Sequence, residues 1–374
     1  MRPLKVLCSN RRNMNKPRIV VDARMVGPFG HGIGNYVCDM ASALQGRELP
    51  YSLSFLVAEN TPATSPVRQY EHQVSSIPFL HPKEIFLLSG EIAEMKPALY
   101  HSPSFSSLWR YPCPQAITVH DLNHLHFAGL FHKVYYQHLL LPAVAGAEAI
   151  ASVSATAAAE ISTWMEKNGV RREIALVPNS IRRVPGTAKA EVLGRRNLVD
   201  GSYFLCIANP KPHKNVEFLK RAYRFARAEW TGSHPLPVLV LSIPGEDEEG
   251  IRHSGSLPAD EIPGLLAGAR AFLFPSLYEG FGRPPVEAAL EGTLPVCSDL
   301  PVLREALAGV REARFLPPSD EGAWRAELHR LASEPRAAIA EESLRWIENS
   351  YSLVEVARAA DAFYRRALGR GIRE

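Results

Sequence analysis

The sequence predicts an α/β protein built from two domains, each with a doubly wound parallel sheet. Short apolar or β-branched runs alternate with helical patterns along most of the chain, and repeated strand–helix units imply parallel strands. A chain of 374 residues is also too long for one hydrophobic core and suits two domains of ordinary size. Such sheets carry their chemistry at the carboxyl ends of the strands, so the loops that follow the strands are the places to look for a site.

Composition and charge narrow the class of protein. Apolar residues make up 46% and charged residues 22% of the chain, as in ordinary globular proteins, and a net charge of +3 does not indicate a nucleic-acid partner. The cysteines are odd in number and contain no C-x-x-C pair, which is typical of reduced thiols in the cytosol; they are Cys8, Cys38, Cys113, Cys206 and Cys297. No run has the length of a signal-peptide core or a bilayer span. We therefore expect a cytoplasmic protein, or one bound peripherally to the inner face of the cytoplasmic membrane.

The first domain is expected to span residues 18–185. Residues 1–17 are predicted to be a disordered extension, because the first convincing strand is Arg18–Asp22. A glycine-rich stretch follows at residues 27–34, and apolar residues then recur at helical spacing over residues 33–44. A strand, a glycine loop and a helix can hold a phosphate at the helix N-terminus, although these glycines lack the dinucleotide-binding spacing.

The remaining strands are predicted from short apolar runs bounded by turn residues. They are Leu53–Val57, Ala98–His101, Ala116–His120, Ala149–Val153, Ile174–Val177, Tyr203–Ile207, Val238–Ser242 and Ala271–Phe274. Polar residues stand at or just after the ends of several of these runs, namely His101, His120, Ser154 and the turn at residues 178–180. The carboxyl edge of the first sheet is therefore expected to be polar.

His120, His124 and His126 lie close together beside Asp121 and permit two readings from the residues alone. A metal site is one, but the three histidines share neither a helix face nor a strand face. A histidine that only caps a strand end is the other. The acidic run at residues 246–249 could hold Mg²⁺, but uninterrupted acidic runs are usually solvated faces. We expect no metal site.

The second domain is expected to span residues 186–350, after a polar connection at residues 182–200 whose arginines are predicted to lie on a solvated surface. Its first strand is followed by a basic loop, residues 208–215, and then by a helix. A strand, a basic loop and a helix again suit a bound phosphate, and Lys211 and Lys214 supply positive charge there.

The most informative stretch of the chain is residues 271–296, which predicts a buried strand, a loop, a helix that begins with two prolines, and a second strand. Gly280 and Gly282 let a ligand approach the main chain, and amide groups beside a helix N-terminus suit an anion. Glu279 lies in the loop and Glu287 in the first turns of the helix. The physical pattern alone also fits a tight turn with a glutamate that complements the helix dipole.

The spelling E-G-F-G-R-P-P-V-E at residues 279–287 resembles the donor-sugar motif of family 4 glycosyltransferases, retaining enzymes of the GT-B fold. The resemblance covers most of the chain from Arg18 and includes G-I-G-N-Y at residues 32–36 and V-H-D-L at residues 119–122. It implies two Rossmann-like domains that face a cleft, with the nucleotide sugar held mainly by the second domain. It also implies that residues 351–374 form a helix that crosses back to the first domain.

The resemblance further implies a role for each matching residue. The donor would be bound by Asn209, Lys211, Lys214, Glu279, Gly280, Phe281, Gly282 and Glu287, and the acceptor by Gly32, Ile33, Gly34 and Tyr36. Three of the matching residues would be catalytic, namely His120, Glu279 and Lys214. Asn209 stands where the family usually has an arginine, which removes one expected pyrophosphate contact; Lys211 is expected to compensate.

The expected reaction is the transfer of a hexose with retained anomeric configuration and without a metal or other cofactor. The donor would be a GDP- or UDP-hexose, with GDP-mannose favoured, and the acceptor a glycan or lipid-linked glycan in surface polysaccharide synthesis. A membrane contact is expected from the aromatic and basic residues 131–138, which a buried helix would explain equally well. The alternatives are a GT-B protein that binds sugar nucleotides without turnover, suggested by Asn209, and a nucleotide-sugar epimerase.

Overall fold

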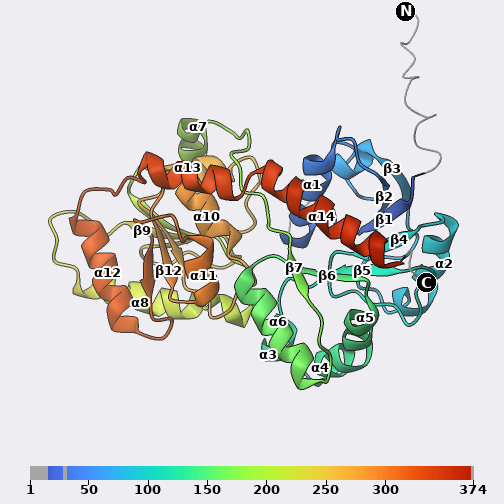
Figure 1. The fold of residues 1–374 in the computed structure, drawn as a ribbon. Coiled ribbons are helices and arrows are strands. Elements are labelled where there is room, and N and C mark those ends of the chain that lie inside the picture. The colour runs from blue at the N-terminus through green and yellow to red at the C-terminus, as the bar shows by residue number, and fades with distance from the viewer. Residues whose placement is uncertain (1–15, 28–31, 128, 372–374) are drawn as a thin grey trace, which may run out of the picture.

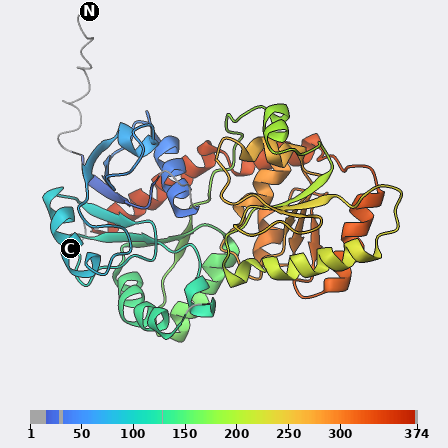
Figure 2. The ribbon, with the colours of Figure 1, turned by 180° about the vertical axis from the view of Figure 1, so that it is seen from behind.

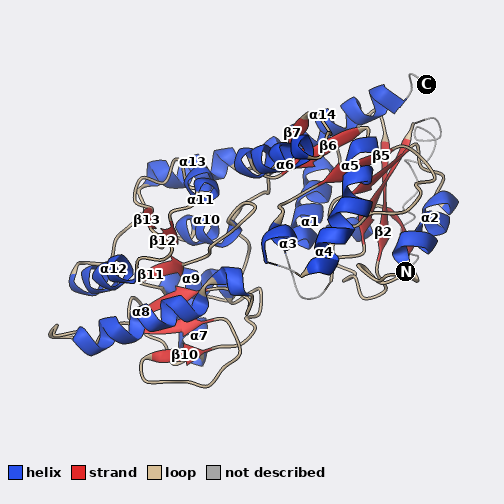
Figure 3. Ribbon diagram, turned by 90° about the horizontal axis from the view of Figure 1, so that it is seen from below, coloured by secondary structure: helices blue, strands red, loops and turns tan. Residues whose placement is uncertain are grey.

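The computed structural model describes residues 16–27, 32–127 and 129–371, and within them it contains two parallel sheets that lie side by side (Figures 1 and 2). The first sheet has seven strands in the order β3-β2-β1-β4-β5-β6-β7, and the second has six in the order β10-β9-β8-β11-β12-β13. Helices cover both faces of each sheet (Figure 3). The predicted fold class, two Rossmann-like domains of the GT-B type, is confirmed.

The first domain begins at the predicted strand. Its strands are β1 Arg18–Ala23, β2 Ser52–Val57, β3 Glu71–Val74, β4 Leu99–Ser102, β5 Gln115–Thr118, β6 Ala149–Ser152 and β7 Ile174–Leu176. Its helices are α1 Gly32–Leu44, α2 Glu84–Glu94, α3 Asn123–Phe127, α4 Leu130–Tyr135, α5 Leu141–Gly146 and α6 Ala155–Lys167, with short turns η1 Pro66–Gln69 and η2 Tyr136–Leu140. The extension predicted at residues 1–17 lies outside the described residues except for its last two positions.

The second domain repeats the alternation of strand and helix. Its strands are β8 Tyr203–Cys206, β9 Val238–Leu241, β10 Ile251–His253, β11 Ala271–Phe274, β12 Pro295–Ser298 and β13 Arg314–Leu316. Its helices are α7 Lys189–Arg195, α8 Val216–Glu229, α9 Ile262–Gly268, α10 Arg283–Leu290, α11 Pro301–Ala306, α12 Glu321–Ser333 and α13 Glu341–Ser350, with one 3₁₀ turn, η3 Pro212–Lys214. The last helix, α14 Leu353–Gly371, runs from this domain back over the first (Figure 1).

Three strands were not predicted from the sequence, and helix α7 is among the helices that were not. β3, β10 and β13 are edge strands of three or four residues with mostly exposed or half-buried side chains, so they show no apolar run. The connection at residues 182–200 was expected to be irregular, yet it contains α7, in which only Val192 and Leu193 are buried. Two apolar residues in seven do not define a helical period, which explains the miss. Its arginines are also not all free in solvent, since Arg196 pairs with Glu261 at 2.6 Å.

Helix α14 joins the two domains through buried side chains. Ala360, Phe363, Tyr364 and Ala367 are at most 2% exposed and belong to a hydrophobic cluster that includes residues of both domains. The ring of Tyr364 packs against Tyr51, and the Tyr51 hydroxyl donates to Asp361 at 3.1 Å. These contacts fix the first domain to the end of the second.

His101, at the carboxyl end of β4, is buried between α14 and β5. Its Nδ1 lies 2.8 Å from the Tyr364 hydroxyl and its Nε2 lies 2.9 Å from the Thr118 hydroxyl. Burial, with a smaller contribution from His120, lowers the pKa of His101 to about 3, so the ring is neutral near pH 7.

We predict that acidification lowers the free energy of unfolding in part through His101. The unfolded chain takes up a proton near the ordinary histidine pKa of 6.5 and the folded chain does not, so this contribution is present above pH 6.5 and is lost as the pH falls toward 3. Between about pH 6 and pH 4, the free energy of unfolding in urea should fall about 1.4 kcal/mol per pH unit more steeply in the wild type than in His101→Gln. Equal slopes would show that His101 takes up its proton without unfolding.

Candidate functional site

The loop between β11 and α10 contains the glutamate motif, and it presses against the first domain. A β-carbon added at Gly280 would lie 2.4 Å from the main-chain oxygen of His120 and 3.0 Å from the β-carbon of Asp121. Only glycine allows this approach, which brings the V-H-D-L and E-G-F-G segments together from opposite domains. Gly282 has φ +98°, a conformation that also favours glycine, and α10 begins at the next residue.

Hydrogen bonds tie the same loop to the first domain. The Ser154 hydroxyl at the start of α6 donates to the Gly280 carbonyl oxygen at 2.7 Å. The Tyr278 hydroxyl donates to Glu160 of α6 at 2.8 Å and accepts the Leu122 amide at 2.9 Å. Tyr278 was missed in the sequence, where a tyrosine next to a glutamate motif gives no signal of a partner more than a hundred residues away.

Lys214 and Glu279 form an ion pair at the centre of the site. The Lys214 Nζ lies 2.6 Å from Glu279 Oε1, and the two side chains are 16% and 13% exposed. Lys214 also lies over the Phe274 ring, 5.5 Å from its centre. Each charge is balanced by the other in this ion pair. An anionic ligand that binds Lys214 would therefore displace Glu279 as the partner of the lysine.

Glu287 lies in the first turns of α10 with one oxygen engaged. The Arg283 Nε donates to Glu287 Oε1 at 2.6 Å, and the Arg283 Nη1 donates to Asp39 of α1 at 2.9 Å. Among the described residues, Oε2 of Glu287 has no hydrogen-bond partner. This oxygen can accept hydrogen bonds from a ligand.

His120 is a neutral histidine at the boundary of the two domains. Its Nε2 lies 2.9 Å from the Pro103 carbonyl oxygen and therefore donates to it, which leaves Nδ1 with the lone pair. Burial lowers the pKa of His120, while the Pro103 bond and Asp121 act in the opposite direction. The residue stands two positions beyond the end of β5, whereas the sequence placed it inside the strand.

Tyr36 is placed to hold His120. It is 1% exposed, its ring meets the His120 ring edge-on at 4.9 Å between centres, and its hydroxyl lies 3.2 Å from that of Thr118. The buried ring thus supports a site residue, and the expected contact of Tyr36 with the acceptor stays a prediction. Gly32 is exposed, Ile33 is half-buried and Gly34 is buried at the start of α1. Positions 28–31 of the predicted glycine loop lie outside the described residues.

The basic loop after β8 places two further donor candidates in solvent. Asn209 and Lys211 are exposed. His213, between Lys211 and Lys214, is 4% exposed, and its Nε2 lies 3.3 Å from the Asn123 amide nitrogen of the first domain. Burial, then Lys214 and Lys211, lowers the pKa of His213 to about 4. The loop therefore brings lysine charge to the boundary and keeps its histidine neutral.

Among the described residues, no group of three or more histidine, cysteine, aspartate or glutamate side chains is arranged to hold a metal ion. His126 pairs with Glu160 at 2.7 Å, and the His124 ring stacks on His132. In the acidic run, Glu248 pairs with Arg224 at 2.7 Å. The acidic run is thus held by cations of α8.

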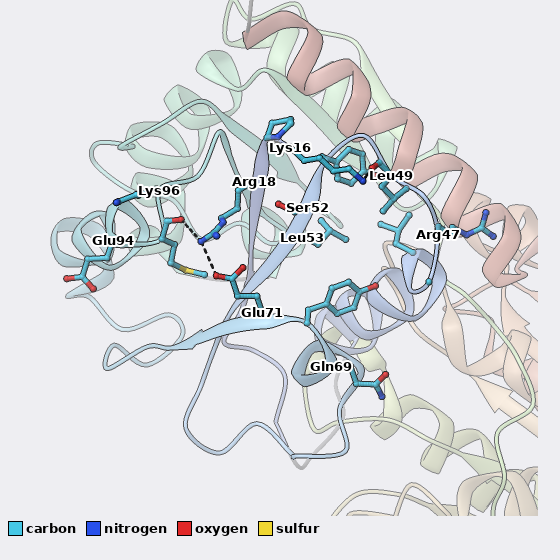
Figure 4. Close-up of a pocket in the computed structure, with 16 residues that line it drawn as sticks. Lys16, Arg18, Arg47, Leu49, Ser52, Leu53, Gln69, Glu71, Glu94 and Lys96 are labelled. Atoms are coloured by element: carbon cyan, nitrogen blue, oxygen red, sulfur yellow. Dashed lines mark hydrogen bonds and ion pairs between the residues drawn. The ribbon is translucent and has the colours of Figure 1, made fainter. Parts of the chain in front are cut away.

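A pocket of about 1240 Å³, called the hollow below, lies at the amino-terminal edge of the first sheet, opposite its carboxyl edge (Figure 4). It is lined by the amino-terminal ends of β1 and β2, and two of the cations that line it have partners: Arg18 binds Glu71 and the Met95 oxygen, and Lys16 binds the Leu49 oxygen. The motif residues lie at the carboxyl edge of the second sheet and meet the carboxyl edge of the first. The hollow is therefore separate from the candidate site.

Solved structures with the same architecture are two-domain proteins. Sucrose-phosphate synthase from Thermosynechococcus elongatus superposes with a TM-score of 0.71, covers 95% of this chain and 100% of its own, and is 15% identical. The Anabaena protein Alr3699/HepE, solved in complex with UDP and glucose, superposes with a TM-score of 0.67, covers 93% of this chain and 99% of its own, and is 15% identical. Together with the two facing sheets, these likenesses show the GT-B fold.

Sequence comparisons match the second domain to one family model and much of the chain to two mannosyltransferases. Residues 196–353 match the family model described as "Glycosyl transferases group 1". The O-antigen chain mannosyltransferase RfbU of Salmonella typhimurium is 28% identical over 60% of this chain and 62% of its own length. The O-antigen chain mannosyltransferase B of Escherichia coli is 29% identical over 61% of this chain and 63% of its own. The chain thus spans less than two thirds of these relatives, and its second domain is similar to the group 1 glycosyl transferases, the likeness that the motif predicted.

We predict that Gly280→Ala forces the two domains apart. The new methyl group would overlap the His120 oxygen, which is main chain and cannot turn away, so the free energy of unfolding should fall by about 1–3 kcal/mol in urea. Gly194→Ala is the control, because it lies in α7 with no atom within 4 Å of the added carbon. The control should be neutral or more stable by about 0.5–1 kcal/mol. A Gly280→Ala protein as stable as the control would mean that the domains do not meet at His120.

Proposed function

We propose that this chain is a retaining hexosyltransferase that uses a nucleotide diphosphate sugar. The observation that carries the proposal is that Lys214 pairs with Glu279 while the next residue, Gly280, lies against His120 of the other domain, in a chain similar to group 1 glycosyl transferases. Opposite charges and a neutral histidine at one junction can bind a diphosphate, hydroxyl groups and an anomeric centre together.

Each residue would act through the group that it can offer. Lys214 and the main-chain amides of residues 280–282 would stabilise the departing diphosphate, as preorganised donors do for developing negative charge. Glu279 would accept hydrogen bonds from the transferred sugar, and Oε2 of Glu287 from the ribose hydroxyls. His120 would lie against the sugar with Nδ1 as an acceptor. Lys211, exposed beside the same loop, would add the positive charge that Asn209 does not supply.

Retention would follow from a displacement on one face of the sugar. A covalent route needs a carboxylate free to attack the anomeric carbon. Glu279 is engaged by Lys214, which favours its use as a hydrogen-bond acceptor, so we propose that the incoming acceptor approaches on the face that the diphosphate leaves, through an oxocarbenium-like state. Charge neutralisation by lysines and amides lets this scheme operate without a metal ion.

GDP-mannose is the proposed donor, and the acceptor would be a glycan or a lipid-linked glycan in the synthesis of a surface polysaccharide. This proposal is supported by the names of the relatives, which are O-antigen chain mannosyltransferases, and by a shorter match of 35% identity over 123 residues to an MMP alpha-(1->4)-mannosyltransferase of Mycolicibacterium hassiacum. A UDP-hexose is the second choice. A protein that binds donors without turnover would release no nucleotide, and an epimerase would change the sugar without freeing it from the nucleotide.

The two glutamates should affect binding of GDP and GDP-mannose differently. Glu287→Ala should weaken both ligands alike, by about tenfold or more, because both carry the ribose and a hydrogen bond to a charged group contributes about 1.5–3 kcal/mol. Glu279→Gln should weaken GDP-mannose only. It should leave GDP unchanged or bound more tightly, because Lys214 loses the carboxylate that competes with the diphosphate. Isothermal titration calorimetry measures all four affinities, and UDP with UDP-glucose serves as the parallel series.

The same experiment decides between the proposed function and a structural role for the motif. Thermal unfolding of each variant shows that the fold is kept. If folded Glu279→Gln and Glu287→Ala bind both ligands as the wild type does, the motif is structural and the proposed donor site is wrong. If the wild type releases GDP from GDP-mannose only when a glycan acceptor is added, the alternative of a silent binding protein is removed.

Peripheral membrane contact belongs to this proposal, but two aromatic rings of the segment predicted for it, residues 131–138, face the interior. Tyr136 is buried, and the Tyr135 hydroxyl donates to the Phe105 oxygen at 3.1 Å, so both rings serve the interior. Among the described residues, no helix is both long enough and apolar enough to cross a bilayer. Contact with a lipid surface must therefore use side chains other than these two rings.

The exposed apolar side chains around α2 offer such a surface. Phe86 and Leu87 of α2 are 66% and 56% exposed, and Trp109 is 64% exposed. The Trp109 amide donates to the Ile85 oxygen at 3.0 Å, which holds this residue against α2. Exposed Lys83 and Arg110 stand beside these residues, and aromatic groups with flanking cations suit an anionic lipid surface.

We predict that the protein sediments with vesicles of phosphatidylcholine and phosphatidylglycerol and that Phe86→Ser with Trp109→Ser reduces the bound fraction severalfold. Val199→Ser, in the second domain and 69% exposed, is the matched control and should sediment like the wild type. Binding that is absent in the wild type, or equal in all three proteins, would remove membrane contact through this surface.

A further inference from the structure

Arg283 links the donor motif to the first domain in a way that the motif itself does not require. It stands between Gly282 and Pro284, at a position that the motif leaves open, and its side chain is 21% exposed. Its guanidinium divides between two carboxylates, with Nε on Glu287 at 2.6 Å and Nη1 on Asp39 at 2.9 Å. One arginine therefore contacts both the proposed ribose ligand and a helix of the other domain.

Asp39 is an unusual partner because it lies on the inner side of α1. It is 5% exposed, and burial raises the pKa of its carboxyl group, while Arg283 and then Arg182 act in the opposite direction. Arg182 is 3.9 Å away and 43% exposed, so Arg283 is the closer cation. A carboxylate removed from water needs such a partner, which holds the guanidinium toward α1.

The geometry of arginine gives this contact a consequence for Glu287. A guanidinium free to turn engages a carboxylate through two parallel hydrogen bonds, which would occupy both oxygens. The Nε–Nη2 edge makes such a pair. Here Asp39 holds Nη1 outside that edge and with it the orientation of the guanidinium, and Glu287 receives one bond, through Nε. Its Oε2 is thereby kept available.

We propose that Arg283 is a positioning residue and that Asp39 makes it hold Glu287 by one oxygen, so that the other oxygen accepts the ribose of a nucleotide. Nucleotide affinity then depends on the contact between the domains, because Asp39 belongs to the first domain and the nucleotide to the second. The inference rests on the proposed function through the role of Glu287. It adds that the donor site is complete only when α1 is in place.

Asp39→Asn tests the inference. The amide keeps the size of the side chain but loses the charge, so Arg283 is free to pair with both oxygens of Glu287. The dissociation constants for GDP and for UDP, measured by calorimetry, should rise about tenfold, a typical size for coupling between separate sites. In an Arg283→Leu background the same Asp39→Asn change should have no effect on either constant, because no guanidinium remains to compete for Glu287.

Glu305→Gln controls for a loosened domain interface. Glu305 of α11 accepts hydrogen bonds from the Ala155 and Thr156 amides at the start of α6, at 2.6 and 2.8 Å, so it also joins the two domains without contact to Glu287. This variant should bind GDP and UDP like the wild type. Thermal unfolding shows which variants are folded, and Asp39→Ser provides a second uncharged variant if Asp39→Asn is not.

Every outcome bears on the inference. It is overturned if Asp39→Asn binds both nucleotides normally, if its effect persists in the Arg283→Leu background, or if Glu305→Gln weakens binding as much. A wild type that binds neither GDP nor UDP removes the proposed function, and this inference with it. Normal binding by the wild type with a neutral Asp39→Asn removes the inference alone.

Discussion

The close approach of Gly280 to the His120 carbonyl oxygen is the contact on which the site depends. It brings a loop of the second sheet against a loop of the first, and it is possible only because Gly280 has no side chain. The hydrogen bonds from Ser154 and Tyr278 secure the same loop. Residues from both domains are therefore positioned relative to one another by the backbone of a single short segment.

Charge is arranged in pairs around this contact. Lys214 pairs with Glu279, and Arg283 divides between Glu287 and Asp39, all of them largely shielded from water. Partly buried charges are costly unless they are paired, so the pairs keep ionised side chains in place at low cost. A charged ligand must therefore compete with a side chain of the protein for its binding residue. The affinity for the ligand then depends also on residues that do not contact the ligand.

A line of polar contacts connects the last helix with His120. His101 is hydrogen-bonded to the hydroxyl groups of Tyr364 in α14 and of Thr118. The Thr118 hydroxyl is in turn hydrogen-bonded to the hydroxyl of Tyr36, whose ring packs on the His120 ring. Each of these groups is buried, so each needs the next as a hydrogen-bond partner. Helix α14 thus helps to orient a residue of the site although it lies outside it.

Much of the fold followed from the sequence because its signals are local. Buried parallel strands are short apolar runs, and the stretch from β11 to β12 shows its strand, glycine loop and proline-started helix in consecutive residues. Edge strands such as β3 and β13 were missed because their exposed side chains leave no such run. The motif named Glu279 and Glu287, and the basic loop named Lys214, but only the structure shows that Lys214 and Glu279 are in contact.

The sequence by itself determined the class of fold, the likeness to group 1 glycosyl transferases and the identity of several residues at the junction. Only the tertiary structure decided their partners: Tyr36 faces inward onto His120, Tyr278 reaches α6, and Arg283 binds Asp39 across the domain boundary. The physical reason is separation along the chain. Asp39 and Arg283 are 244 residues apart, and which charges meet at such a distance depends on how two sheets pack, which no local pattern of residues encodes.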